Sequence, residues 1–168
     1  MQTSWHVAQM NVGTVLYPTD DERMSGFMNR LDEINELAER SPGFVWRLQS
    51  GSGNATDIDA GGPPLFLVNM SVWTSVESLL DYVYKSMHRT VMVDRRKWFE
   101  RPKGIYQVLW WVRAGHEPTV EEGLERLAYL DKYGPSSHAF TFKSKYPSPG
   151  EAGGPEDLKP EPYCSGWE

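Results

Sequence analysis

Polar and aromatic side chains alternate with apolar ones in the segment LVNMSVWTS, residues 67–75. Asn69, Ser71 and Trp73 fall on every second residue, with methionine and valine between them. This period of two predicts a β-strand with one apolar face and one face that carries an amide, a hydroxyl and an indole. Amides and hydroxyls orient small molecules by hydrogen bonding, and an indole offers a flat apolar surface. The segment therefore predicts part of a site for a small organic ligand.

Three other segments repeat this two-faced pattern. The polar faces of the four predicted strands carry Gln9, Asn11, Arg47, Gln49, Asn69, Ser71, Trp73, Gln107 and Trp111. We expect the apolar faces to pack under the helices, which leaves the polar set on the opposite face of the sheet. A dry core would not hold these groups, because an unpaired buried polar group costs about 1–3 kcal/mol. The mixture favours a concave cavity. The alternative interpretation is a polar subunit interface, and the same face can serve as both cavity and interface.

Arg47 is the charged member of this polar set. Inside a cavity its guanidinium needs a partner, which is either a substrate carboxylate or phenolate, or an internal aspartate such as Asp57 or Asp59. The internal ion pair is the favoured interpretation. Trp98, in the segment RRKWFE, is predicted to close one end of the cavity, and the arginines beside it are predicted to be solvated.

A general base is suggested by His88, which lies four residues after Tyr84 on a predicted helix. Residues four apart share one helix face, and an imidazole has a suitable intrinsic pKa of about 6.5. The alternative is a partly exposed or capping histidine. His6 is predicted to have a structural role and His116 a turn or cap role, whereas His138, at the start of the last predicted strand, carries no signal.

The elements that carry these residues follow the order β-α-β-β-α-β, and a further helix and a short strand come after them. Predicted strands cover residues 5–16, 41–51, 65–75, 104–115 and 138–146, and predicted helices cover 19–41, 74–100 (with a bend or break near 90–93) and 119–133. The first six elements match the ferredoxin-like fold of the α+β class, an antiparallel sheet with both helices on one face. We predict one domain over residues 1–146 and a mobile Pro-, Gly- and Glu-rich tail over 147–168.

Composition argues against several functions. The 168 residues carry a net charge of −6 without a basic stripe, so we expect no nucleic acid partner. We see no apolar run of membrane-spanning length and no signal peptide, so we expect a cytoplasmic protein. The lone Cys164 cannot form an internal disulfide, and the chain has no metal-ligand motif, so we expect no metal. The 7 Trp and 8 Tyr are numerous enough to line a site for a flat ligand.

Several segments resemble a bacterial and fungal family that carries only a domain-of-unknown-function label. They are HVAQMN, SPGFVWRLQ, LVNMSVW, YVYKSMHRTV with the following WF, LWWVRAGHEPTVEEGLERL and GPSSHAFTF, and they span residues 5–146. The family belongs with the dimeric α/β-barrel superfamily, which includes antibiotic-biosynthesis monooxygenases, heme-degrading monooxygenases and the chlorite dismutase group. The resemblance implies a ferredoxin-like subunit that forms a homodimer, with the two sheets paired into a barrel.

The resemblance also implies candidate catalytic residues. The heme-degrading members use an asparagine on the first strand, a tryptophan near the end of the third and a histidine on the following helix. Asn11, Trp73 and His88 stand in those elements here, with a longer separation between tryptophan and histidine. The favoured interpretation is a homodimeric enzyme similar to the cofactor-independent monooxygenases. It would act on an aromatic or polyketide-like substrate in secondary metabolism, with Gln9, Arg47, Asn69, Ser71, Tyr84, Trp98 and Trp111 in substrate binding.

Two alternatives stay open: a heme-binding protein or heme enzyme, and a non-catalytic ligand-binding module. The substrate stays open, as does the choice between oxidation, cyclisation and isomerisation.

Overall fold

A computed structural model describes residues 4–50, 56, 65–87, 94–149 and 151. The elements are β1 (Trp5–Thr14), the 3-10 turn η1 (Glu22–Met24), α1 (Ser25–Arg40), β2 (Phe44–Arg47), β3 (Phe66–Trp73), α2 (Val76–Met87), α3 (Arg95–Trp98), β4 (Gln107–Arg113) and α4 (Val120–Tyr133). The strands form one antiparallel sheet in the order β2-β3-β1-β4. This is the strand order of a ferredoxin-like unit, so the predicted α+β fold is confirmed.

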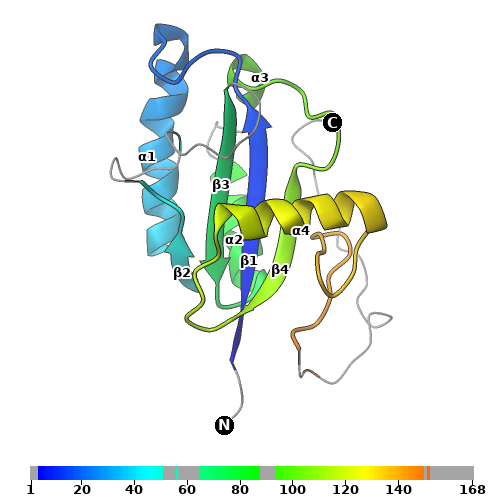
Figure 1. Ribbon diagram of the computed structural model, residues 1–168. Helices are drawn as coiled ribbons and strands as arrows, with labels where there is room; N and C mark the ends of the chain where they lie inside the picture. The colour runs from blue at the N-terminus through cyan, green and yellow to red at the C-terminus, as the bar shows by residue number, and fades with distance from the viewer. Residues whose placement is uncertain (1–3, 51–55, 57–64, 88–93, 150, 152–168) are drawn as a thin grey trace.

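Helices cover both faces of the sheet. Figure 1 shows α4 crossing in front of the strands and α2 behind them, with α1 beside β2. The even-numbered residues of β1, β3 and β4 form one packed cluster with Leu130 and other apolar residues of α4. The odd-numbered residues Val7, Trp73 and Leu109 pack with residues of α1 and α2 instead.

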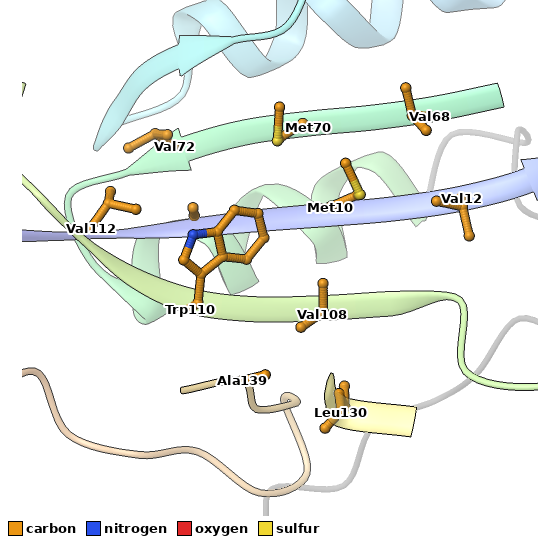
Figure 2. Packing of buried hydrophobic residues seen from close by; sticks show 11 residues of the cluster. Met10, Val12, Val68, Met70, Val72, Val108, Trp110, Val112, Leu130 and Ala139 are labelled. Carbon is orange, nitrogen blue, oxygen red and sulfur yellow. The ribbon is translucent and has the colours of Figure 1, made fainter. Parts of the chain in front are cut away.

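The apolar face of the sheet therefore lies under α4. Figure 2 shows its side chains, which come from three neighbouring strands: Met10, Val12, Val68, Met70, Val72, Val108, Trp110 and Val112. Gly123 of α4 is buried above them, and a Cβ added to it would lie 2.3 Å from Cε of Met10 and 3.3 Å from Sδ of Met70. The missing side chain lets the helix approach the sheet closely. The Trp110 indole donates a hydrogen bond to Glu122 of α4 at 3.0 Å, which satisfies its buried nitrogen.

The expectation for the two faces of the sheet was wrong. The apolar set was expected under the first two helices, and the polar set on a face that a second subunit would cover. In the structure, α1 and α2 cover the polar face, and α4 of the same chain covers the apolar one. The physical reason is that α4 carries Val120, Leu124, Leu127 and Leu130, and an apolar stripe of this size needs an apolar surface to pack on.

Some element boundaries also differ from the predictions. β2 is shorter than predicted and has an irregularity between Phe44 and Trp46. The predicted helix over 74–100 is split into α2 and the separate α3, with residues 88–93 outside the described part. In place of the predicted strand over 138–146, a single bridge joins Phe140 to Leu109 of β4. Most of the predicted tail, residue 150 and residues 152–168, also lies outside the described part.

Candidate functional site

Three predicted site residues form a buried chain of hydrogen bonds beneath α1 and α2. The Gln9 amide donates to Ser71 Oγ at 2.9 Å, and the Trp73 indole donates to the same oxygen, also at 2.9 Å. Gln9 and Ser71 are buried and Trp73 is 0% exposed. Both acceptor positions of the serine hydroxyl are thus occupied within the protein. Gln9, Ser71 and Trp73 organise the interior of this face and support the residues beside them.

The next row across the sheet consists of three amides, which we call the amide row: Asn69, Asn11 and Gln107. Strand pairing places Asn11 directly opposite Asn69 on one side and opposite Gln107 on the other. Asn69 is exposed although it lies on an interior strand, and Asn11 and Gln107 are half-buried. Solvent therefore reaches the middle of the sheet on the face that α1 and α2 cover elsewhere.

The two asparagines of the amide row have hydrogen-bonding capacity to spare. Asn69 Oδ1 accepts a bond from Gln9 at 3.1 Å. Across the described residues, the side chain of Asn11 makes no hydrogen bond, and the side-chain nitrogen of Asn69 has no acceptor. A half-buried amide without a partner is suited to bind a ligand, because desolvated polar groups in proteins are normally hydrogen-bonded.

Aromatic side chains lie further along the strands, beyond Ser71, on one side of the amide row. Trp73 stacks on Tyr82 of α2 with ring centroids 4.9 Å apart, and Phe44 contacts the indole edge-on at 5.5 Å. Burial raises the pKa of Tyr82 to about 12. The phenol therefore stays protonated near neutral pH and cannot act as a base, and its hydroxyl donates to the carbonyl of Ile34 at 3.4 Å.

Sequence reasoning missed Tyr82 and chose Tyr84 instead. Tyr84 is 44% exposed on the outer side of α2. The signal that identifies Tyr82 is its place three residues after Leu79, which is buried in the same cluster.

On the other side of the amide row, along the strands, lie α3 and the residue after it. Gly13 lies two residues beyond Asn11 on the same face, and a Cβ there would be 2.9 Å from the Phe99 ring. Glycine therefore lets this ring lie against the strand. The Arg95 guanidinium stands over the rings of Phe99 and Tyr106, at 4.7 and 5.9 Å from their centroids. A second arginine, Arg30 of α1, holds α3 in place by binding Asp94 at 2.5 Å.

Arg47 forms the internal ion pair that was favoured, although its partner is a different residue. The guanidinium Nε lies 2.8 Å from Oε1 of Glu39 on α1, and the arginine side chain is 12% exposed. The expected partners Asp57 and Asp59 lie outside the described residues. The ion pair ties α1 to β2 and compensates the charge of Arg47.

The remaining two tryptophans of the predicted site lie in packed surroundings. Trp98 is buried between α1 and α3, with its ring 5.9 Å from that of Phe27. Trp111 is half-buried, and its indole donates to the carbonyl of Tyr146 at 2.9 Å, which fastens the segment after α4 to the sheet.

The proposed base His88 lies outside the described residues, directly after α2. The other histidines lie away from the amide row. His116 contacts Glu122 at 2.7 Å, His138 contacts Glu125 at 3.0 Å, and His6 is in register with Val112 of the apolar face. His116 lies in the turn before α4, where a turn role was predicted, and His6 lies on the strand face for which a structural role was predicted.

The described residues contain neither a metal-holding group nor a membrane-spanning helix. No group of three or more His, Cys, Asp or Glu side chains in that part of the chain is placed to hold a metal ion. In the same residues, no helix has both the length and the apolar character needed to cross a lipid bilayer.

The fold and the amide row together define a ferredoxin-like α+β protein with a solvent-accessible polar strip between its sheet and its first two helices. The chain belongs to the family described as "Domain of unknown function (DUF3291)", whose model matches residues 6–154. The expected membership of an uncharacterised family is thereby confirmed. No curated protein matches the chain.

Two solved structures from Nitrosomonas europaea are similar to the chain. One is a protein of unknown function with 10% identity and a TM-score of 0.43, where the match covers 70% of this chain and 97% of the other. The second is a candidate antibiotic biosynthesis monooxygenase with 15% identity and a TM-score of 0.40, where the match covers 69% of this chain and 93% of the other.

Proposed function

We propose that the protein binds a planar, oxygenated aromatic molecule on the amide row and oxidises it with molecular oxygen, without a resident cofactor. The observation that carries the proposal is the unpartnered amide of Asn11, which lies half-buried between Asn69 and Gln107 in the middle of the sheet. Amides that project from adjacent strands can bind the hydroxyl and carbonyl oxygens along one edge of a fused-ring ligand.

The division of roles follows from the protonation states of the groups. The amides of Asn11 and Asn69 orient the substrate and stabilise the enolate that forms from it by hydrogen bonding. Tyr82 contributes its ring to the aromatic wall, stacked on Trp73, while its hydroxyl donates to the carbonyl of Ile34. A base is still needed, and we propose His88 for this role.

The chemistry can be written for an anthrone, a three-ring ketone with one CH₂ group. The base removes a proton from this CH₂, and the resulting carbanion transfers electrons to O₂, so that a C–O bond forms. The hydroperoxide then loses water and leaves a carbonyl. One anthrone and one O₂ give one anthraquinone and one water, with oxygen as the oxidant, so no external reductant is consumed.

Homodimerisation remains part of the proposal, although the polar face that was expected to pair with a partner is covered by α1 and α2, and the apolar face is covered by α4. Heme is not favoured by the described residues, because His6, His116 and His138 lie away from the amide row and none can be an axial ligand there. A heme at this site would depend on His88.

The test uses the full chain with 1,8-dihydroxyanthrone in air-saturated buffer. Oxygen uptake and quinone absorbance are followed for the wild type, Asn11→Ala and His88→Ala, and the circular dichroism of each variant is compared. We expect oxidation above the spontaneous rate in the wild type and at least a tenfold loss in both variants. An unchanged rate in Asn11→Ala overturns the proposed site, and an unchanged rate in His88→Ala removes the proposed base. Binding without oxygen uptake contradicts the enzymatic part and leaves a ligand-binding protein.

A further inference from the structure

Arg95 of α3 places a positive charge beside the amide row. A Cβ added to Gly13 would lie 3.6 Å from Nη2 of Arg95. Gly13 is two residues beyond Asn11 on β1, so this Cβ and the Asn11 side chain are on the same face of the sheet. One such step along a strand is about 6.6 Å. The guanidinium therefore lies on the polar face, next to the residue on which the proposed function rests.

The backbone around Arg95 is joined to the end of β1. Figure 1 shows α3 beside this end of the strand. The amide of Leu16 donates to the carbonyl of Trp98 at 2.7 Å, and the amide of Glu100 donates to the carbonyl of Thr14 at 2.8 Å. These bonds fix the position of the short helix relative to the sheet, and with it the position of the guanidinium.

The ring contacts of Arg95 are compatible with anion binding. Its guanidinium stands over the rings of Phe99 and Tyr106. A guanidinium packs its flat face on aromatic rings, whereas its five N–H donors lie in its plane. Arg95 can therefore keep contacts within the protein and still bind a carboxylate through Nη2.

The structure separates Arg95 from its neighbour Arg96, although the sequence predicted solvent exposure for both. Arg96 is exposed, whereas Arg95 is half-buried against the sheet. A half-buried guanidinium attracts an anion more strongly than an exposed one, because water and salt screen its charge less. Arg95 is thus the arginine of this segment that is suited to recognise a ligand.

The other charges of the segment also favour an anion. Residues 94–103 contain five Lys and Arg and only two acidic residues, in a chain with a net charge of −6. One of these two carboxylates, Asp94, contacts Arg30 at 2.5 Å and Lys97 at 2.9 Å. An excess of positive charge raises the local concentration of anions and speeds their association.

We propose that Arg95 determines the substrate class of the amide row by binding an anionic group, and that the preferred ligand is a fused-ring aromatic carboxylate. Hydroxyl or carbonyl oxygens of one ring would bind Asn11 and Asn69. A carboxylate further along β1 would bind Arg95, and a planar molecule of three fused rings is long enough to reach both. This inference rests on the proposed function only in placing the ligand at the amide row.

The test compares two ligands that differ in one group. 1,8-Dihydroxyanthraquinone-3-carboxylate carries the anion, and its 3-hydroxymethyl analogue is uncharged. Binding of each ligand to the full chain is followed near neutral pH by quenching of tryptophan fluorescence. We expect the wild type to bind the carboxylate about tenfold more tightly, as one charge-assisted hydrogen bond allows. Arg95→Gln should abolish this preference and change the affinity for the hydroxymethyl compound by less than about twofold.

The matched control is Arg96→Gln, which removes the same charge from the exposed neighbour and should keep the preference. Arg95→Lys keeps the charge without the planar set of donors, so it should reduce the preference without abolishing it. Melting temperatures show which variants are folded, and Arg95→Lys carries the test if Arg95→Gln does not fold.

The inference is overturned if the wild type binds the two ligands equally, or if the preference persists in Arg95→Gln. An equal fall for both ligands in Arg95→Gln also overturns it, because the arginine would then support the site without contacting the carboxylate. Loss of the preference in Arg96→Gln as well would show a general effect of charge and would overturn the assignment to Arg95. All three results leave the proposed function intact.

Two results separate the inference from the proposed function. A preference that depends on Arg95, without oxidation of the anthrone, supports the inference and contradicts the proposed reaction. If the wild type binds neither ligand, both the proposed site and the inference are contradicted.

Discussion

The two faces of the sheet differ in how their polar groups are satisfied. On the face under α4, the even-numbered side chains of β1, β3 and β4 are apolar, and the indole nitrogen of Trp110 has a protein partner in Glu122. On the face under α1 and α2, Gln9 and Ser71 are satisfied internally, whereas the side chain of Asn11 has no hydrogen-bond partner in the described residues. The comparison separates a face built for stability from one that keeps polar groups available.

The covering helices account for this difference. α4 lies across three strands and is close enough to the sheet for its buried glycine to touch two methionines. Over the other face, α1 packs mainly against β2 and α2 against β3, and the middle row of amides stays accessible. A helix pair that leaves one row of a sheet open can bind a ligand there without unfolding its core.

The largest expected effect comes from exchanging the character of two adjacent residues. Met10→Asn puts an amide among the buried residues under α4 and should lower the free energy of unfolding by about 3–5 kcal/mol, since packing is lost and a polar group is left unpaired. The adjacent Asn11→Leu should change it by less than about 1 kcal/mol, since the site is half-buried and its amide has no partner to lose. Urea denaturation of both variants measures this. Equal losses would contradict the distinction between the faces.

The next largest effect is expected at the buried chain of hydrogen bonds on the polar face. Ser71→Ala removes the acceptor shared by Gln9 and Trp73. It should lower the free energy of unfolding by about 2–3 kcal/mol, because buried donors are left unpaired. Asn69→Ala, in the amide row, is the control and should cost less than about 1 kcal/mol. If the Ser71→Ala protein were as stable as the wild type, the two hydrogen bonds to the serine hydroxyl would not contribute to stability.

A smaller effect, dependent on pH, is expected where α4 meets the apolar face. Burial raises the pKa of Glu122, but hydrogen bonds from His116 and Trp110 outweigh it and hold the pKa below its usual value of 4.5. The ionised carboxylate therefore stabilises the fold above pH 4.5, and this contribution is lost as the pH falls through the lower folded-state pKa. The urea midpoint should fall more in the wild type than in Glu122→Gln between pH 6 and about 3. Parallel curves for the two proteins would exclude this contribution.

The smallest effect concerns the aromatic wall. Tyr82→Phe keeps the ring stacked on Trp73 and removes the hydroxyl that donates to the Ile34 carbonyl, so the free energy of unfolding should fall by about 1 kcal/mol. Tyr84→Phe, on the exposed side of α2, is the matched control and should leave the free energy of unfolding unchanged. Urea denaturation measures both, and a greater loss in Tyr84→Phe than in Tyr82→Phe would contradict the packing of Tyr82 between α2 and the sheet.

Part of the candidate site could be predicted because it lies on strands. Alternation places Gln9 with Asn11 on one side of β1 and Asn69 with Ser71 on one side of β3, since side chains in a strand point to opposite sides in turn. The pairing register of β1 and β3 then puts both pairs on the same face of the sheet. Residues on helices were harder to place. Tyr82 and Tyr84 are two residues apart on α2, and only packing shows which of them faces Trp73.

The sequence by itself determined the order of elements, the ferredoxin-like sheet and the division of its strands into an apolar and a polar face. These features follow from local periodicity, which depends on backbone geometry alone. Only the tertiary structure decided that α4 covers the apolar face, that Glu39 is the partner of Arg47, and that the Asn11 amide has no hydrogen-bond partner in the described residues. These features depend on which surface the apolar stripe of a helix packs against and on contacts between residues that are distant in the chain. Local periodicity contains no information about either.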